Sequence, residues 1–285
     1  MMTPKKLHNL FGLKWNPFSP ELPVEGLYLP AAISDFLWRI ENCLVREGGF
    51  AVVDGDSGTG KSATLRLLAD RLGGLPELRL AVLTHPSSHM ADFYREMGEL
   101  FGVPLRPHNR WCGFKDLRQA WQEHLEHLRL RPVLLIDEAQ ELSTTLLAEL
   151  RLLASACFDS QILLTIVFAG DAKLSERLTA PELRPLVSRL RTRLHFNPAP
   201  SEVLLEYLRH LLATAGSPKL MSPELMNTLC EHSGGNLRAL TNLANDLLAT
   251  AVQREQPQLD EKLFLELVGE PRIRLTKTQR PTPRR

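Results

Sequence analysis

The sequence predicts an α/β fold in which a parallel sheet is sandwiched by helices and is followed by a small all-α domain. Short segments that are apolar on both faces alternate with helical segments in the first 197 residues, which is typical of a parallel sheet covered on both sides. Beyond residues 198–200, where two prolines occur, only helical patterns follow. The 285 residues are enough for one such core and a smaller companion.

The chain divides into four predicted parts. Residues 1–30 are proline-rich and irregular, and we expect an ordered N-terminal arm because its apolar side chains need cover: Phe11, Leu13, Trp15 and Phe18. Residues 31–197 form the α/β core and residues 198–268 a helical domain. Residues 269–285 form a basic tail, which we expect to be disordered alone.

The elements of the core follow from its apolar patterns and its glycine and proline breaks. Strands are predicted at four positions: 50–54, 79–84, 132–136 and 162–169. Helices are predicted in the core at 31–46, 61–72, 91–101, 114–128 and 144–156, and in the helical domain at 201–215, 222–232, 236–253 and 259–268. Ser222 before Pro223 is a helix N-cap signal.

Composition excludes several classes of protein. The net charge of +1 gives no global basic field of the kind that announces a nucleic-acid protein. The four cysteines have neither zinc-ligand nor redox-pair spacing, so we expect reduced thiols. No run of 18 apolar residues occurs, which predicts a cytoplasmic protein without a membrane contact.

The strongest motif is a glycine-rich loop between a predicted strand and a predicted helix. It matches G-x-x-x-x-G-K-[ST] and consists of Gly55, Asp56, Ser57, Gly58, Thr59, Gly60, Lys61 and Ser62. Glycines let the backbone N–H groups approach phosphates, and the following helix adds its positive N-terminal end. Lys61 is expected to reach the β- and γ-phosphates, and Ser62 to bind Mg²⁺. The loop therefore predicts ATP and Mg²⁺ as cofactors.

An acidic pair follows the strand predicted at 132–136. Asp137 is expected to hold the Mg²⁺ through water, and Glu138 to act as the general base that activates the attacking water. Parallel strands present such residues at the edge where open sheets bind ligands. An acidic pair alone also fits a solvated strand end, so the hypothesis depends on the phosphate loop.

Two further polar residues end strands of the predicted sheet. Asp171 follows the strand at 162–169 and is a candidate for sensing the γ-phosphate or positioning the water. It fits a helix N-cap equally well. Thr84 is a similar candidate for orienting Glu138.

Arginines supply the remaining candidates. In phosphoryl transfer, an arginine inserted from a neighbouring molecule neutralises charge in the transition state. Arg189 is the residue we favour, with Arg184, Arg191 and Arg193 as alternatives that also fit a solvated basic face. Arg238, in the first turn of a helix in the helical domain, is expected to fold back onto the nucleotide.

In this order, the motifs resemble those of an AAA+ P-loop NTPase: Walker A at 55–62, Walker B at 133–138, sensor 1 near Asp171, an arginine finger near Arg189 and sensor 2 at Arg238. The helical domain resembles the AAA+ lid. The resemblance implies ATP bound between subunits of a homo-oligomeric ring or filament.

A closer resemblance, up to about residue 268, is to the ExeA/GspA-like ATPases. It rests on residues 10–18, Leu-Ile-Asp-Glu-Ala-Gln at 135–140, and segments 163–170 and 207–216. The superfamily that this chain resembles contains two functional kinds of ATPase. One energises assembly of a secretion channel, and the other (TniB-, TnsC- and MuB-like) binds DNA and recruits or stimulates a transposase.

Three functions follow as hypotheses. The missing membrane helix and peptidoglycan-binding region and a tail with six basic residues, 272–285, favour a transposition helper with double-stranded DNA and a transposase as partners. The loop at 108–111, ending in Trp111 with Lys115 nearby, is a second candidate DNA contact, although Trp111 also fits an anchor of that loop to the core. The alternatives are a soluble secretion-type ATPase that remodels a protein partner, and a nucleotide switch without hydrolysis, which an intact Glu138 opposes.

Overall fold

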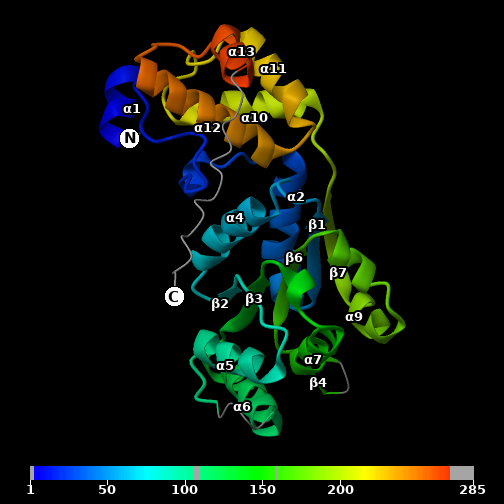
Figure 1. Cartoon of the computed structure of the whole chain (residues 1–285). Coiled ribbons are helices and arrows are strands. Elements are labelled where there is room, and N and C mark those ends of the chain that lie inside the picture. Colours follow the sequence, from blue (N-terminus) through cyan, green and yellow to red (C-terminus); the bar gives the residue numbers. More distant parts are fainter. Residues whose placement is uncertain (1–2, 106–109, 158–159, 270–285) are drawn as a thin grey trace, which may run out of the picture.

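The computed structural model describes residues 3–105, 110–157 and 160–269. Its centre is a parallel sheet in the order β2-β3-β6-β1-β7 (Figure 1). The strands are β1 (Phe50–Gly55), β2 (Leu78–Leu83), β3 (Arg131–Ile136), β6 (Thr165–Gly170) and β7 (Leu190–Phe196). The parallel sheet flanked by helices confirms the predicted α/β fold class.

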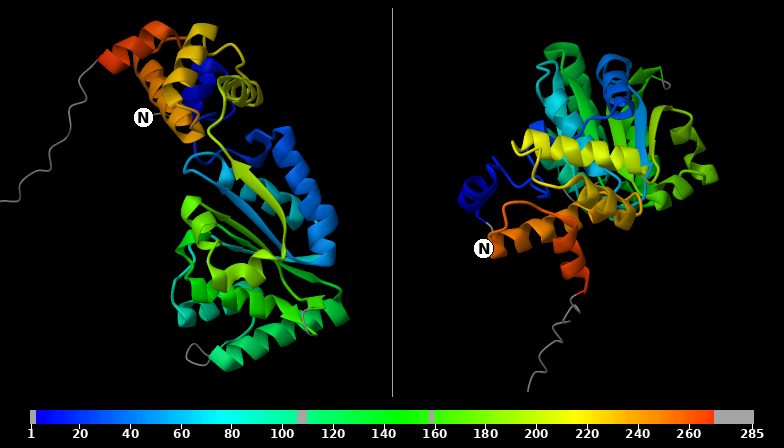
Figure 2. Two further views of the ribbon diagram at one scale, coloured as in Figure 1. Left: turned by 90° about the vertical axis from the view of Figure 1, so that its right-hand side faces the viewer. Right: turned by 90° about the horizontal axis from the view of Figure 1, so that it is seen from above.

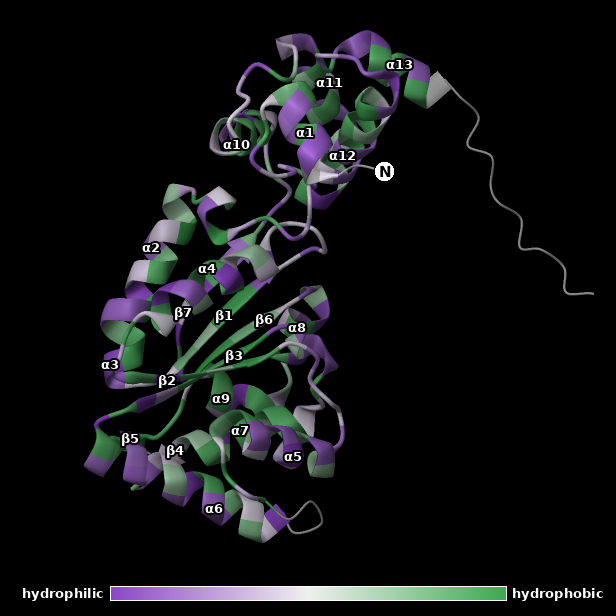
Figure 3. Ribbon diagram, turned by 90° about the vertical axis from the view of Figure 1, so that its left-hand side faces the viewer, coloured by the Kyte–Doolittle hydropathy of each residue, from purple (hydrophilic) through white to green (hydrophobic). Residues whose placement is uncertain are grey.

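Helices cover both faces of this sheet, as the hydropathy view makes plain (Figure 3). One face carries α2 (Ala31–Arg39), α3 (Val45–Glu47) and α4 (Lys61–Gly73). The other carries α5 (Met90–Phe101), α6 (Arg110–Glu123), α7 (Thr144–Ala154), α8 (Ala172–Arg177) and α9 (Arg184–Val187). Each strand feeds both layers: in β1, Phe50 and Val52 join one apolar core, whereas Ala51 and Val53 join the other.

Shorter helical turns connect these elements. In the described part of the chain, two π-helical stretches continue longer helices, Ile40–Leu44 after α2 and His124–Leu128 after α6. Three 3₁₀ turns occur among the same residues, at Val24–Gly26, Ala139–Glu141 and Pro181–Leu183.

The strand predictions were incomplete in two places. Strand β7 was not predicted, because its residues alternate between half-buried Leu190 and Leu194 and exposed Arg191 and Arg193. That alternation is typical of an edge strand, which is less covered than the central strands of the sheet. The continuous apolar run at 162–169 hides a break: β5 (Gln161–Ile162) pairs antiparallel with β4 (Ser155–Ala156), and β6 begins three residues later.

The helical domain consists of α10 (Ser201–Thr214), α11 (Pro223–Ser233), α12 (Leu237–Arg254) and α13 (Glu261–Gly269). Ser222 caps α11 as predicted, because its hydroxyl accepts from the backbone N–H of Leu225. The helical domain lies at one end of the sheet (Figure 2). Of these helices, and of all others in the described part of the chain, none is long and apolar enough to span a membrane.

The N-terminal arm is more regular than predicted. It opens with α1 (Pro4–Phe11), which begins at Thr3 with a proline in its first turn. Four further prolines at 17, 20, 23 and 30, beyond the end of this helix, made the whole arm look irregular in the sequence. Apolar side chains of the arm complete the core of the helical domain: Leu7, Phe11, Leu13, Phe18 and Leu22. The basic residues of the tail, 272–285, and residues 108 and 109 of the candidate DNA-contacting loop lie outside the described residues.

Candidate functional site

The glycine-rich loop turns sharply between β1 and α4. Gly55, Gly58 and Gly60 have φ angles of 148°, 83° and 110°, which side chains other than hydrogen rarely allow. A Cβ atom on Gly55 would lie 2.6 Å from the carbonyl oxygen of Phe196 in β7. The loop therefore requires glycine both for its backbone conformation and for its packing against the edge strand.

Lys61 lies at the start of α4 and folds back over this loop. Its Nζ donates to the carbonyl oxygens of Gly55 and Asp56, each at 2.8 Å. Burial lowers the pKa of Lys61, although the nearby carboxylates of Glu138, Asp171 and Asp137 oppose that change. The amine is thus preoriented by its own loop and faces three acidic residues from other elements.

The acidic pair follows β3 at the same edge of the sheet. The Asp137 N–H donates to the carbonyl oxygen of Leu83 in β2 at 2.9 Å, which extends the ladder by one residue. Glu138 adopts a left-handed conformation (φ 51°), and its N–H donates to Asp137 Oδ1 at 2.9 Å. A left-handed non-glycine residue is strained and is typical of functional sites. The turn directs Glu138 into the cavity that the phosphate loop borders.

The residues that end β6 and β2 differ in their contacts. Asp171 caps α8, because its Oδ1 accepts from the Lys173 N–H at 2.9 Å, and it also lines the cavity. Thr84 contacts His85 Nδ1 at 3.0 Å, and among the described residues it makes no bond with Glu138.

Gln140 makes the contact with Glu138 that we expected of Thr84. Its Nε2 donates to a carboxylate oxygen of Glu138, and its Oε1 accepts from the Asp171 N–H at 3.2 Å. Gln140 is buried. Our sequence reasoning gave it no role, although its place two residues after the acidic pair was a signal.

The helical domain contacts the phosphate loop directly. Arg238 Nη1 donates to Ser57 Oγ at 2.9 Å, and its backbone N–H donates to the Gly58 carbonyl oxygen at 3.1 Å. Asn236, which we did not single out, donates from Nδ2 to the Ser57 carbonyl oxygen at 2.8 Å. The start of α12 therefore lies against the loop and carries Arg238 to the cavity.

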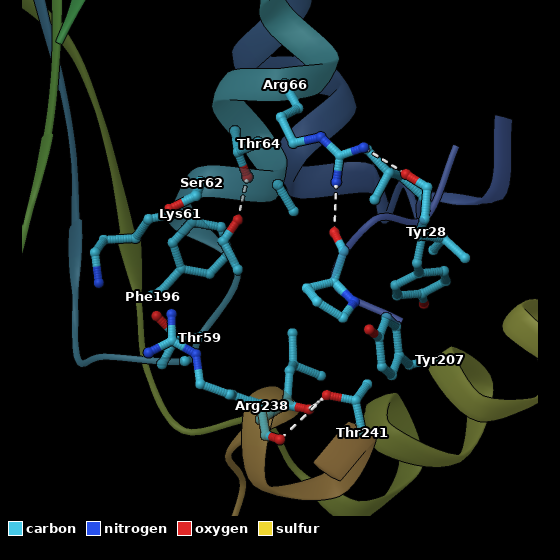
Figure 4. A pocket seen from close by; sticks show the side chains of 18 of the residues that line it. Tyr28, Thr59, Lys61, Ser62, Thr64, Arg66, Phe196, Tyr207, Arg238 and Thr241 are labelled. Carbon is cyan, nitrogen blue, oxygen red and sulfur yellow. Dashed lines mark hydrogen bonds between the residues drawn. The ribbon is translucent and has the colours of Figure 1, made fainter. Parts of the chain in front are cut away.

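A cavity of about 530 Å³ lies between the phosphate loop, the arm and the helical domain (Figure 4). Lys61, Ser62 and Arg238 border its polar end. Tyr28 of the arm and Tyr207 of α10 line another wall, with ring centroids 5.9 Å apart. The cavity thus joins a cationic end to an aromatic and apolar wall.

Arg66 of α4 holds the arm in place at this cavity. Its guanidinium donates to the carbonyl oxygens of Pro20, at 3.3 Å, and Leu22. Figure 4 shows Arg66 reaching from the helix toward the arm beside Tyr28. The arm had no predicted role in the site, because these contacts use only its backbone.

None of the four candidate finger arginines lines the cavity. Arg189 Nη1 lies 3.5 Å from Ser155 Oγ, Arg191 pairs with Glu47, and Arg193 Nε lies 3.6 Å from Asp54 Oδ2. Arg184 is exposed, and its guanidinium makes no bond with another described residue.

The residues fit a nucleoside triphosphate with Mg²⁺. The loop leaves room that side chains would fill: a Cβ on Gly58 would lie 2.4 Å from Asn236 Oδ1. Lys61 and Arg238 would neutralise phosphate charge, and Ser62 and Asp137 offer the oxygen ligands that Mg²⁺ prefers. The aromatic and apolar wall suits a planar base.

The comparisons with known proteins agree with this geometry. Residues 45–178 match the model of an AAA domain. Over 248 residues the chain is 31% identical to general secretion pathway protein A of Aeromonas hydrophila, and the match covers 86% of this chain and 44% of that protein. This chain therefore spans less than half the length of that relative.

Two solved structures show the same fold. Cdc6p of Pyrobaculum aerophilum has a TM-score of 0.70 at 18% identity, over 85% of this chain and 67% of its own. The Aeropyrum pernix ORC1 protein in complex with DNA has a TM-score of 0.64 at 18% identity, over 88% and 67% of the two chains.

The strand order of the sheet, the phosphate loop and the segment that matches the AAA domain all indicate the same structural class. The chain contains an AAA domain with the P-loop NTPase fold, followed by a helical part. The matched AAA domain indicates a nucleotide hydrolase, and 86% of this chain is similar to part of general secretion pathway protein A.

Proposed function

We propose that this chain binds ATP with Mg²⁺ and hydrolyses it to ADP and phosphate. The observation that carries the proposal is that Lys61, Ser62, Glu138, Asp171 and Arg238 line one cavity of about 530 Å³ beside the phosphate loop, with Asp137 next to Glu138 at the end of β3. These side chains come from three strand or helix ends and from a separate helical domain. Their meeting provides charge neutralisation, metal ligands and a base in one place.

Each residue has a separate proposed task. Lys61 and the loop N–H groups bind the β- and γ-phosphates, and Arg238 closes the site from the helical domain. Ser62 and Asp137 hold the Mg²⁺, which when bound supplies charge neutralisation at the β- and γ-oxygens. Glu138 accepts a proton from the attacking water. Asp171 orients that water or responds to the γ-phosphate.

The arginine that completes the site comes, in this proposal, from another copy of the chain. None of Arg184, Arg189, Arg191 and Arg193 borders its own cavity, so an arginine finger would act in trans in a ring or filament. Arg189 remains our first candidate. Arg184 is a strong second, because it is exposed and its guanidinium is unpaired among the described residues.

Nucleotide binding and phosphate release test the proposal together. Lys61→Ala should abolish binding of a fluorescent ATP analogue, whereas Glu138→Gln should bind it and release no phosphate. The Arg71→Ala variant is a matched control, because Arg71 lies on the same helix and contacts Glu41 instead of the cavity. Binding that persists in Lys61→Ala, or turnover that persists in Glu138→Gln, would contradict the assigned roles.

We propose two partner classes, and each has its own support. The match to a general secretion pathway protein supports a secretion-type ATPase that remodels a protein partner in the cytoplasm. DNA as a partner is supported by fold neighbours that include an ORC1 protein in complex with DNA, whereas the recruited transposase rests on the sequence resemblance alone.

The exposed face of α6 is the described surface that best suits DNA. Trp111 does not anchor its loop to the core, since it is 64% exposed. Its ring is parallel to that of Phe114, with centroids 6.2 Å apart, and Lys115 Nζ lies 4.9 Å from its centroid. Aromatic rings beside cations can stack on bases and contact phosphates.

A DNA gel shift with a non-hydrolysable ATP analogue separates the two partner classes. DNA binding that weakens in Trp111→Ala and as salt rises supports the transposition helper. The Trp38→Ala variant is a matched control, because Trp38 is also exposed (58%) but lies on α2. If the protein does not bind DNA and DNA does not stimulate ATP hydrolysis, the secretion-type function is favoured.

A further inference from the structure

Gln140 joins the two strand ends that flank the proposed reaction centre. We propose that Gln140 is a positioning residue that fixes the carboxylate of Glu138 according to the position of the end of β6. The inference rests on the proposed function, in which Glu138 is the general base. It assigns to Gln140 the orienting task that the sequence suggested for Thr84.

The side-chain amide of Gln140 makes a hydrogen bond at each end. Its Nε2 donates to one carboxylate oxygen of Glu138, and its Oε1 accepts from the Asp171 N–H at 3.2 Å. The two atoms belong to one rigid planar group, so a displacement at one end changes the hydrogen bond at the other. Because among the described residues only Oε2 of Glu138 accepts a hydrogen bond, Oε1 remains available to accept a proton from water.

Hydrogen bonds from α8 fix the backbone around Gln140. Arg177 of α8 donates to the carbonyl oxygens of Gln140, at 2.8 Å, and Leu142. Gly170, the last residue of β6, leaves space for the amide, because a Cβ there would lie 2.9 Å from Gln140 Oε1. The position of the amide is therefore set by α8 and β6 and not by solvent.

Through Gln140, the orientation of the Glu138 carboxylate depends on the position of β6, which lies next to the strand that leads into the phosphate loop. Strand β6 lies between β3, which ends before Glu138, and β1, which ends in the phosphate loop. A shift at the end of β6 would reach Glu138 through Gln140 without passing through β3. Misplacing a catalytic group by about 1 Å lowers a rate about 100-fold, so this single amide has a large effect on turnover.

Two substitutions separate the two bonds. Gln140→Met keeps the approximate volume and removes both. Gln140→Glu keeps the side-chain length and the acceptor for the Asp171 N–H, but a carboxylate oxygen replaces the Nε2 donor, so the bond to Glu138 is lost. Both should lower kcat about 10- to 100-fold and leave KM and the affinity for ATP within about twofold.

Gln253→Met is the matched control. Gln253 is exposed on α12, and it lies outside both the cavity lining and the α6 surface proposed for DNA. It should leave kcat and the melting temperature unchanged. If Gln140→Met fails to fold, Gln140→Glu still tests the bond to Glu138.

Amide hydrogen exchange at Asp171 tests the link without nucleotide. Exchange should be about fivefold faster in Gln140→Met, because the acceptor is lost, and unchanged in Gln140→Glu. Unchanged exchange in both variants overturns the link between Gln140 and β6. Unchanged kcat in both, or a loss of affinity at constant kcat, overturns the positioning role.

The same measurements distinguish this inference from the proposed function. A wild-type protein without turnover, or turnover that survives in Glu138→Gln, contradicts the proposed function. Turnover that is lost in Glu138→Gln but kept in both Gln140 variants contradicts only the inference about Gln140.

Discussion

Asn236 makes two separable bonds where the helical domain meets the phosphate loop. Its Oδ1 accepts from the Ala239 N–H at 3.0 Å and caps α12, while its Nδ2 donates to the Ser57 carbonyl oxygen at 2.8 Å. Asn236→Ser keeps a cap of nearly equal quality and removes the amide donor. Asn236→Ala removes both bonds. The two variants therefore distinguish docking of the domain from stability of its helix.

The size of each effect follows from typical hydrogen-bond energies. A neutral hydrogen bond contributes about 1 kcal/mol, which corresponds to about a fivefold change in an equilibrium constant. Because α12 supplies a wall of the cavity, Asn236→Ser should weaken ATP binding by up to about fivefold at an unchanged melting temperature. Asn236→Ala should show the same weakening and lose about 1 kcal/mol more stability through the missing cap.

Titration with a fluorescent ATP analogue and denaturant unfolding measure the two effects. Asn242→Ser is a matched control, because Asn242 lies on the same helix and lines the same cavity but makes no hydrogen bond to the phosphate loop among the described residues. If Asn236→Ser binds ATP like the wild type while Asn236→Ala binds more weakly, the cap and not the bond to Ser57 holds the domain in place. That result would refute the reasoning.

Three further predictions follow from individual contacts. Arg110→Ala should lower the free energy of unfolding by about 2 kcal/mol, because the buried Glu149 loses an ion pair and, among the described residues, keeps only one hydrogen-bond donor. Urea titration measures this loss, and an unchanged unfolding midpoint would contradict it. Burial raises the pKa of the Cys230 thiol to about 11, so at pH 8 it should resist alkylation until the protein unfolds, whereas the three exposed cysteines should react first. Arg189→Ala should preserve ATP binding and remove most hydrolysis; normal hydrolysis there, with loss in Arg184→Ala, would move the finger to Arg184.

The fold could be predicted wherever the sequence pattern reported complete burial. Strands β1 and β3 are buried and apolar over residues 50–53 and 132–136 because both faces are covered there, and both strands were predicted. Strand β7 escaped prediction because an edge strand with alternating arginines resembles a solvated basic segment. Helix α1 escaped because its apolar face packs against helices more than 200 residues away in sequence, which no local window can show.

The predicted part of the site is the part whose chemistry is contiguous in sequence. The phosphate loop and the acidic pair each occupy one short segment, so residue type and spacing were sufficient to identify them. Asn236 and Arg66 could not be identified in this way, and Gln140 could be given no task from its place near the acidic pair alone. Each acts through a bond to another segment's backbone or to a carboxylate whose orientation depends on a turn.

The arm links the α/β core to the helical domain, and this determines how binding affects the whole chain. It is tied to α12 through Asn16 and Asn245, at 2.8 Å, and to α4 through Arg66. Near the cavity, the helical domain meets the core itself through a few polar bonds of about 1 kcal/mol each. A molecule that fills the cavity would touch arm, core and helical domain at once. Its contacts would then outweigh those bonds, so occupancy of the cavity would set the position of the helical domain, and with it the position of Arg238.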